Sequence, residues 1–384
     1  MAIGHSDDLD AEDAVEAIVA QCRDTLGDAA PKAGLVFSTY ATDPGTLVSK
    51  IRERMPGIEL IGTTSMAEMS SVLGFQEDSV TLAVFASDTV DITAGMGTNV
   101  ASDPRAAARR AVEEAKEKTT KEPRLCVALP SVGGHEPAIL IEHIREELGG
   151  NVGVVGGGSA PATYRDDPMT AHQFHNDRFT SDAVPILLFS GPLVYSLGID
   201  TGWRPVGPRG KVTRSSGRIL QEIDGRPAVE FYDRYVGARA EPTPANPLAV
   251  FEPGTEDFFL RVPTVFDRED GSITAAGAIP EGTEVQLSVA VTDEIFGGSK
   301  SAVEKAIKGF PEGSKPEGAL VFSCAIRKLV LGTRTSGEYD IAQDQLGAAV
   351  PICGFYSMGE IAPIETGATR YHNETMVAVL VGTE

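Results

Sequence analysis

The chain is organised around the stretch GFYSMGEI, residues Gly354–Ile361, which follows an apolar run, Ala349–Cys353, typical of a buried strand. A related stretch, GTTSMAEM, occupies residues Gly62–Met69 and follows its own apolar run, Ile58–Ile61. The two stretches share glycine, serine, methionine and glutamate at the same four of their eight positions. We interpret this match as an internal repeat.

A third copy of the same plan lies between these two. Residues 152–155 form another short apolar run, and the glycine turn Gly156–Ser159 follows it. In each copy an earlier apolar run precedes the one that ends in glycine, and a segment with helical features separates the two: these earlier runs are Gly34–Ser38, Leu125–Pro130 and Gly318–Ser323. Two strands joined by a helix favour a parallel pair with a right-handed crossover. The sequence therefore predicts an α/β protein with mixed sheets built from repeated strand–helix–strand units.

Length and composition restrict the class of protein. At 384 residues the chain is longer than one core usually holds, so two domains are expected. A net charge of −22, from 55 acidic and 33 basic residues, opposes binding to nucleic acid and to anionic membranes. No apolar run approaches the roughly 20 residues of a membrane span, and we expect a cytoplasmic location. The four cysteines form no CxxC pair and are expected to be buried and reduced.

Polar side chains and glycines follow the predicted strands in all three copies. Ligands of such sheets tend to lie just beyond the carboxyl ends of the strands. The predicted ligand-binding residues are Thr63, Thr64, Glu68, His135, Gly157, Gly158, Ser159, His175, Phe355, Tyr356, Ser357 and Glu360.

Structural roles compete with this prediction. Glu68 and Glu360 also suit a role as helix caps or acceptors of backbone amides, and Phe355 and Tyr356 suit core packing. If the carboxylates face a pocket, they suit an ammonium group, and the amides of a glycine turn suit a carboxylate. An ammonium group and a carboxylate are the two charged groups of an amino acid.

The same motifs resemble the FIST family. The resemblance rests on the glycine turn at residues 156–160, on Gly354–Pro363 (GFYSMGEIAP), and on His372–Thr375 (HNET). It implies an N-terminal helix and tail at residues 1–33, a FIST N-terminal domain at 34–213 and a FIST C-terminal domain at 214–384. It also implies an intracellular sensory protein that binds an amino acid or a similar metabolite and signals through a partner such as a histidine kinase.

Two other functional classes are compatible with parts of the sequence. Some FIST-like proteins are described as haem-based sensors of nitric oxide, and His135, His172, His175 and His372 are the available axial ligands. No other cofactor and no metal site is expected. A catalytic set could be drawn from Ser357, His372 and an aspartate, but the chain lacks a G-x-S-x-G elbow around a serine nucleophile. We therefore expect a binding protein and not an enzyme.

Overall fold

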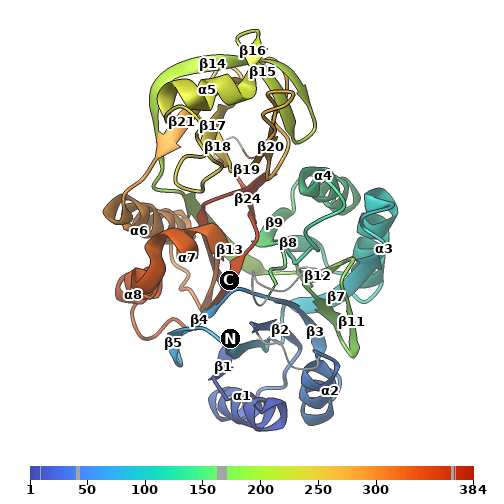
Figure 1. Ribbon diagram of the computed structural model, residues 1–384. Coiled ribbons are helices and arrows are strands. Elements are labelled where there is room, and N and C mark those ends of the chain that lie inside the picture. Colours follow the sequence, from blue (N-terminus) through green and yellow to red (C-terminus); the bar gives the residue numbers. More distant parts are fainter. Residues whose placement is uncertain (9, 40–43, 162–170, 365–366, 368) are drawn as a thin grey trace.

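The computed structural model describes residues 1–8, 10–39, 44–161, 171–364, 367 and 369–384. Within these residues the protein is a mixed α/β structure with several mixed sheets, as the sequence predicts (Figure 1). Three similar units build a central body, and a smaller subdomain protrudes from the third unit. We call residues 204–289 the subdomain.

Each unit consists of a first strand, a helix, two parallel strands with a helical segment between them, a hairpin and a last strand. The first unit comprises β1 (Ala2–Ser6), α1 (Ala11–Leu26), β2 (Ala33–Ser38), α2 (Pro44–Arg54), β3 (Glu59–Thr64), β4 (Glu68–Ser70), β5 (Gly74–Gln76) and β6 (Val80–Phe85). The second comprises β7 (Asp91–Thr98), α3 (Pro104–Lys116), β8 (Pro123–Ala128), α4 (Pro137–Leu148), β9 (Gly153–Gly157), β10 (Gln173–His175), β11 (Arg178–Thr180) and β12 (Ala183–Ser190). The third comprises β13 (Leu193–Asp200), α6 (Thr292–Gly309), β22 (Gly318–Cys324), α7 (Ala325–Leu331), the 3-10 turn η1 (Gly332–Arg334), α8 (Gly337–Leu346), β23 (Ile352–Ser357), β24 (Glu360–Pro363), β25 (Thr369–His372) and β26 (Met376–Thr383).

The units exchange their hairpins in a ring. The three six-stranded sheets have the orders β1-β6-β2-β3-β10-β11, β25-β24-β9-β8-β12-β7 and β13-β26-β22-β23-β4-β5. Each sheet thus contains four strands of one unit and the hairpin of another. The central pairs β2–β3, β8–β9 and β22–β23 are parallel, and their neighbours are antiparallel. This exchange gives the body a pseudo-threefold arrangement and joins the units into one structure.

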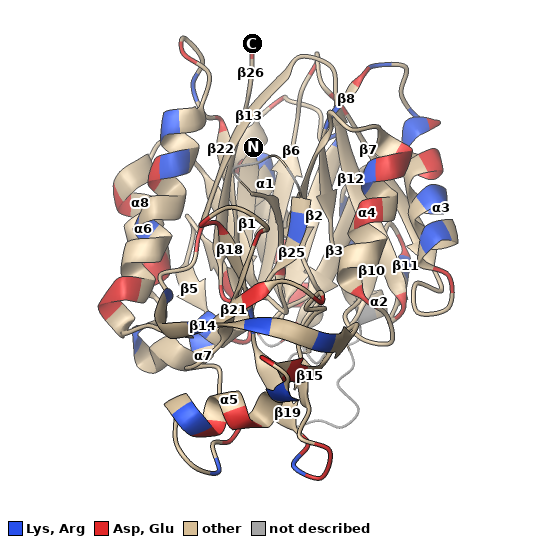
Figure 2. Ribbon diagram, turned by 90° about the horizontal axis from the view of Figure 1, so that it is seen from above, with Lys and Arg blue, Asp and Glu red and all other residues tan. Residues whose placement is uncertain are grey.

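The inner faces of the three sheets share one core. Leu35, Val127, Leu320 and Val379, from all three units, belong to the same buried cluster. The outer faces are covered by α1 and α2, by α3 and α4, and by α6 to α8, each set with its own cluster. Many charged side chains lie on these outer helices and on the subdomain (Figure 2).

A glycine in the first strand of each unit allows the first helix to pack closely. A Cβ atom added to Gly4, Gly95 or Gly198 would lie 2.2, 2.1 and 2.0 Å from a carbonyl oxygen of α1, α3 or α6, respectively. Any larger side chain would have to move the helix backbone. The three units therefore share this helix-packing device as well as their strand order.

The first six residues differ from the expected tail. Ala2–Ser6 form β1, which is buried and pairs with β6. Because β1 occupies the same place as β7 and β13, the first unit begins at the N-terminal end of the described chain and not at residue 34.

The subdomain is inserted between β13 and α6 and has its own sheet and core. It comprises β14 (Arg204–Ser216), β15 (Ile219–Ile223), β16 (Arg226–Pro227), α5 (Ala228–Tyr235), β17 (Leu248–Phe251), β18 (Phe258–Arg261), β19 (Pro263–Phe266), β20 (Ile273–Ala275) and β21 (Glu284–Val289). Trp203, the one tryptophan of the sequence, is buried in a cluster with residues of β17, β18, α6 and α7. This cluster fixes the subdomain against the third unit.

Candidate functional site

The three glycine turns meet through backbone hydrogen bonds. The Met66 amide donates to Tyr356 O (3.1 Å), the Ala160 amide to Thr64 O (3.0 Å), and the Met358 amide to Gly158 O (3.0 Å). Each bond joins the residue after the serine of one turn to the residue before the serine of another. The predicted turn residues therefore come together at one end of the three sheets.

Each of these turns carries a serine bonded to a buried carboxylate or amide. The pairs are Ser65 with Glu68, Ser159 with Gln173 and Ser357 with Glu360. The Ser357 hydroxyl donates to Glu360 Oε1 at 2.8 Å, and Gln173 Nε2 donates to Ser159 Oγ at 2.8 Å. The second member of each pair lies at the start of the exchanged hairpin: Glu68 pairs with Phe355, Gln173 with Thr63 and Glu360 with Gly157. We call these three serines, two glutamates and one glutamine the hub.

Glu68 is fully buried, and its hydrogen-bond donors are the hydroxyl groups of Thr39, Ser65 and Ser79 together with the Thr39 backbone. Thr39 Oγ1 donates to Glu68 Oε2 at 2.6 Å, and Ser79 Oγ donates to the same oxygen at 2.5 Å. Burial raises the pKa of Glu68 from 4.5 to about 7, and the hydroxyl donors only partly oppose it. His5 extends this network, because its ring nitrogens bond Ser70 and Ser79.

Glu360 has the same character in the third unit. Its Oε2 accepts from the Thr375 amide (3.2 Å) and from the Thr375 hydroxyl (2.8 Å). Burial raises the pKa of Glu360 from 4.5 to about 7, while the hydroxyl and amide donors and Arg327 lower it. The neighbouring Glu374 is also buried, and neither of its carboxylate oxygens has a hydrogen-bond partner among the described residues. Burial raises the pKa of Glu374 well above its usual value.

The two unshared aromatics pack inside the protein. Phe355 has no exposed surface and stacks on Phe37, with ring centroids 4.4 Å apart. Gly157 holds the equivalent position in the second turn. A Cβ atom there would lie 3.2 Å from Phe355 Cζ and 2.6 Å from Ser357 Cβ, so the glycine leaves room for both side chains.

Tyr356 belongs to a buried polar network of the third unit. Its hydroxyl donates to Glu338 Oε2 at 2.9 Å, and Arg327 pairs with Oε1 of the same carboxylate at 2.6 Å. Arg327 and Glu338 are both fully buried. The tyrosine therefore satisfies a charged core pair, which is the structural role that competed with ligand stacking.

The two predicted histidines lie apart from the hub contacts. His135 Nδ1 bonds Gly133 O at 2.9 Å, in the loop before α4. His175 lies on β10 next to Arg178, whose Nη2 contacts its Nδ1 at 2.6 Å, and to Glu114. Burial lowers the pKa of His175 to about 4. Hydrogen bonds do not connect either histidine to Ser65, Ser159 or Ser357 in the part of the chain that the structure describes.

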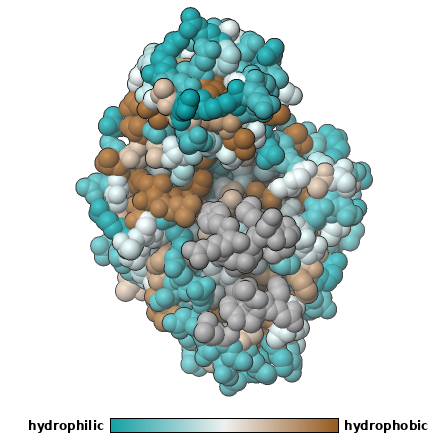
Figure 3. Space-filling model, viewed as in Figure 1, coloured by the Kyte–Doolittle hydropathy of each residue, from teal (hydrophilic) through white to brown (hydrophobic). Residues whose placement is uncertain are grey.

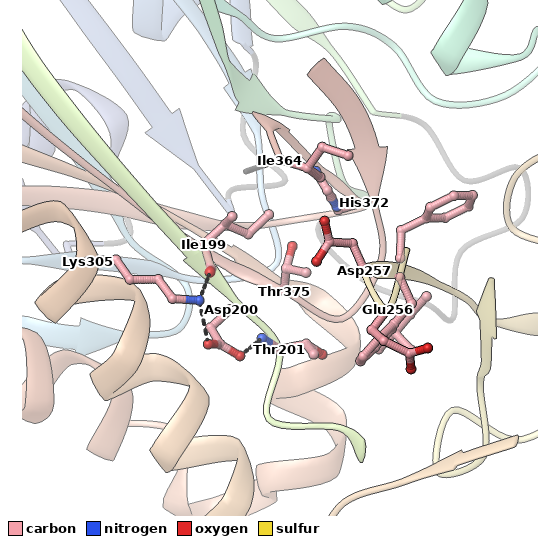
Figure 4. Close-up of a pocket in the computed structure, with 12 residues that line it drawn as sticks. Ile199, Asp200, Thr201, Glu256, Asp257, Lys305, Ile364, His372 and Thr375 are labelled. Carbon is pink, nitrogen blue, oxygen red and sulfur yellow. Dashed lines mark hydrogen bonds and ion pairs between the residues drawn. The ribbon is translucent and has the colours of Figure 1, made fainter. Parts of the chain in front are cut away.

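A cavity of about 200 Å³ lies between the subdomain and the third unit (Figure 4). Its polar lining includes Asp200, Asp257, Lys305, His372 and Thr375. Lys305 Nζ donates to Asp200 Oδ2 at 2.9 Å and to Ile199 O at 3.1 Å, and Figure 4 shows the Asp257 carboxylate pointing toward His372. The apolar lining is Ile199, Phe258, Phe259, Leu260 and Ile364.

Thr375 connects this cavity to the hub. The residue lines the cavity, and its amide and hydroxyl both bond Glu360. The predicted site residue Glu360 is therefore linked to the cavity wall through its hydrogen bonds to Thr375. The cavity residues Asp200, Asp257 and Lys305 were not predicted, because the first two lie at the edges of strands and the third on a helix, far apart in the sequence and without a shared motif.

Gln173 was also missed, although it completes the hub. In the first and third turns the hub glutamate follows its serine by three positions, whereas Gln173 follows Ser159 by 14. The longer connection hides the repeat from position-by-position comparison. The strands β4, β10 and β24 begin at Glu68, Gln173 and Glu360, so aligning the first strands of the three hairpins identifies Gln173.

The cavity does not fit a haem. His372 is the histidine that lines it, and its Nε2 already donates to Ala362 O at 3.0 Å. The volume of about 200 Å³ is also below the roughly 300–1,000 Å³ typical of pockets for drug-sized ligands. Of the other candidate axial ligands, His135 and His175 are held by the contacts given above, and the His172 ring packs against Phe179 with ring centroids 5.7 Å apart.

The fold and the hub define a protein class with three pseudo-equivalent strand–helix–strand units and buried Ser–Glu pairs at the turns. The chain belongs to the FIST family: a FIST N domain matches residues 32–226 and a FIST C domain matches residues 228–363. This confirms the family expected from the motifs. The junction of the two family domains lies within the subdomain, between β16 and α5.

Similar proteins include two from mycobacteria that are named as uncharacterised. A protein of Mycobacterium tuberculosis is 28% identical over 265 residues, which is 65% of this chain and 66% of the relative. A protein of Mycobacterium bovis is 28% identical over 253 residues, covering 62% of each chain. The matches thus span slightly less than two thirds of these relatives.

Solved structures resemble the chain only distantly. The cyanuric acid hydrolase from A. caulinodans aligns over 100% of this chain and 98% of its own, with 9% identity and a TM-score of 0.31. PurLQS from Thermotoga maritima aligns over 100% and 72%, with 12% identity and a TM-score of 0.23. Scores this low support no inference about function. No helix among the described residues is long and apolar enough to cross a membrane.

Proposed function

We propose that the protein is a sensory protein that binds a small metabolite, an amino acid or a close derivative, in the cavity between the subdomain and the third unit. The observation that carries the proposal is the position of this cavity. It is formed by residues of β13, β18, β25 and α6, so it lies between the body and the inserted subdomain. Ligand pockets occur preferentially at such junctions.

The chemistry of the lining supports an amino acid. The Asp257 carboxylate suits an amino group, the paired Asp200 and Lys305 offer polar atoms to the rest of the ligand, and the five apolar residues can contact a hydrocarbon side chain. The small volume suits a metabolite of this size and not a nucleotide. The hub then has a supporting role, since Glu360 orients Thr375 at the cavity wall.

Polar contacts across the same junction provide a route to an output. Arg370 of β25 pairs with Glu252 at 3.0 Å, and Arg261 Nη1 donates to Tyr371 O at 3.1 Å. Both contacts join the subdomain to the strand that carries His372. A ligand that binds one arrangement of the two parts more tightly shifts the population toward it. We propose that a partner protein, such as a histidine kinase, reads this shift.

A binding role accounts for the buried hub better than catalysis. The hub hydroxyls are bonded to carboxylates or an amide inside the protein, and Glu68 and Glu360 have no exposed surface. Burial raises the pKa of Cys126 and of Cys353 to about 12, which keeps these thiols protonated and unreactive.

A thermal-shift screen tests the proposal. The twenty free amino acids and their amine and keto-acid derivatives are added to the purified protein and to two variants. Ile364→Trp fills the cavity, and Leu329→Trp adds the same bulk on α7, where Leu329 is 51% exposed and lies outside the cavity. Figure 3 shows that the surface over α7 is already hydrophobic, so an added tryptophan changes the character of this surface little. We expect a stabilising ligand whose effect is lost in Ile364→Trp and kept in Leu329→Trp. A shift that survives in Ile364→Trp would place the ligand elsewhere.

A further inference from the structure

Some charged side chains of the cavity wall have a partner of opposite charge, and one does not. Asp200 pairs with Lys305, and Glu256 pairs with Arg209 on the subdomain. Within the described residues, no ion pair or hydrogen bond engages the carboxylate of Asp257, which is half-buried and points into the cavity (Figure 4). The lysine is therefore already neutralised, while one carboxylate remains without a partner.

His372 adds an acceptor and no positive charge. Burial lowers its pKa to about 4, so the ring is neutral at physiological pH. Since Nε2 donates to the Ala362 carbonyl, the proton resides on Nε2 and Nδ1 is the acceptor of the ring. A neutral histidine in this tautomer can accept a hydrogen bond from a donor group of the ligand, and it carries no positive charge that would attract an anion.

Two more carboxylates lie behind the same wall. Thr375, which lines the cavity, separates it from Glu360, and Glu374 precedes Thr375 in the chain. Both glutamates are fully buried, and the Glu374 oxygens have no hydrogen-bond partner in the described part of the chain. Arg327, the cation near Glu374, already pairs with Glu338. Arg261 and Arg370 lie near His372, where Arg261 donates to Tyr371 O and Arg370 pairs with Glu252. Burial raises the pKa of both acids, and a positive charge placed close to them would favour their ionised form.

We propose that the cavity recognises its ligand through a protonated amine, which is held between the Asp257 carboxylate and Nδ1 of His372. This inference rests on the proposed function and specifies the charged group that the site selects. An ammonium group has three donors, so it can satisfy both acceptors and one further oxygen. The remainder of the ligand lies against Phe258, Phe259 and Ile364, where a hydrocarbon chain is preferred to a second charge.

Three probes that share the isobutyl side chain test this selection: L-leucine, isopentylamine (leucine without its carboxylate) and 4-methylpentanoate (leucine without its amine). Binding is measured by isothermal titration calorimetry on the full chain at millimolar ligand. Asp257→Asn removes the charge and keeps the shape of the side chain. Asp88→Asn makes the same change at an exposed turn between β6 and β7 and serves as the matched control.

We expect isopentylamine and leucine to bind, 4-methylpentanoate not to bind, and Asp257→Asn to raise the Kd of both amines at least tenfold, while Asp88→Asn leaves it unchanged. The inference is overturned if 4-methylpentanoate binds as tightly as isopentylamine, or if Asp257→Asn leaves the amine Kd unchanged. Should leucine still bind in Asp257→Asn and lose binding only in Ile364→Trp, the amine selection fails and the proposed function stands. If none of the twenty amino acids or their derivatives binds, both fail together.

Discussion

Replacing Glu360 with glutamine is expected to stabilise the protein above neutral pH. The second unit shows that an amide fits the hub: Gln173 Nε2 donates to Ser159 Oγ at 2.8 Å, and its Oε1 accepts from the Ala183 amide at 3.2 Å. In the third unit Ser357 and the Thr375 amide hold the corresponding places. Glu360→Gln can therefore keep the geometry while it removes an ionisable group from a fully buried site.

The magnitude follows from the raised pKa of Glu360. Below pH 4.5 the carboxyl is protonated in the folded and unfolded states alike, so ionisation adds no difference. Between pH 4.5 and about 7 the folded state holds a proton that the unfolded state has lost, and the free energy of unfolding falls as pH rises. At about 1.4 kcal/mol per pH unit, the wild type loses roughly 3 kcal/mol over this window, and the loss then stays constant. Glu360→Gln should not show this loss.

Urea unfolding at pH 5 and pH 8 measures the effect. The difference in unfolding free energy between Glu360→Gln and the wild type should shift by about 2–3 kcal/mol in favour of the variant between these two pH values. Glu312→Gln, an exposed change after α6, should leave the pH dependence as in the wild type. A difference that is the same at pH 5 and pH 8 would refute the reasoning, because it would mean that Glu360 ionises in the folded protein as it does in water.

Three further changes probe the residues around the hub. Phe355→Ala removes a ring that stacks on Phe37 in the core, and should cost about 3–5 kcal/mol in chemical denaturation without a selective loss of ligand affinity at matched stability; an unchanged stability with lost affinity would restore a ligand-stacking role. Arg327→Met leaves Glu338 buried without its cation and should cost about 3–5 kcal/mol, much of which the double variant with Glu338→Gln should recover in thermal unfolding. Gly157→Ala places a Cβ atom 2.6 Å from Ser357 Cβ and should cost about 1–3 kcal/mol, whereas Gly150→Ala, with open space around it, should be nearly neutral; equal effects of the two would contradict the close packing of the turns.

The sequence by itself determined the repeated units and the family. Apolar runs that end in a glycine turn are local features, and they recur at β3, β9 and β23 because each unit solves the same packing problem. The Ser–x–x–Glu spacing of the first and third turns is equally local, and in both turns the serine hydroxyl donates a hydrogen bond to the glutamate.

Only the tertiary structure decided how the units combine and where the open space lies. The exchange of hairpins between units depends on contacts between β4 and β23, β10 and β3, and β24 and β9, which are distant in the chain and carry no pairing signal in their residues. The same holds for the cavity, since Asp257 of the subdomain reaches His372 and Thr375 only because the insertion folds back on the third unit. Phe355 and Tyr356, which look alike in sequence as ligand-binding aromatics, point to opposite faces of one strand, so that one fills the central core and the other satisfies a buried ion pair.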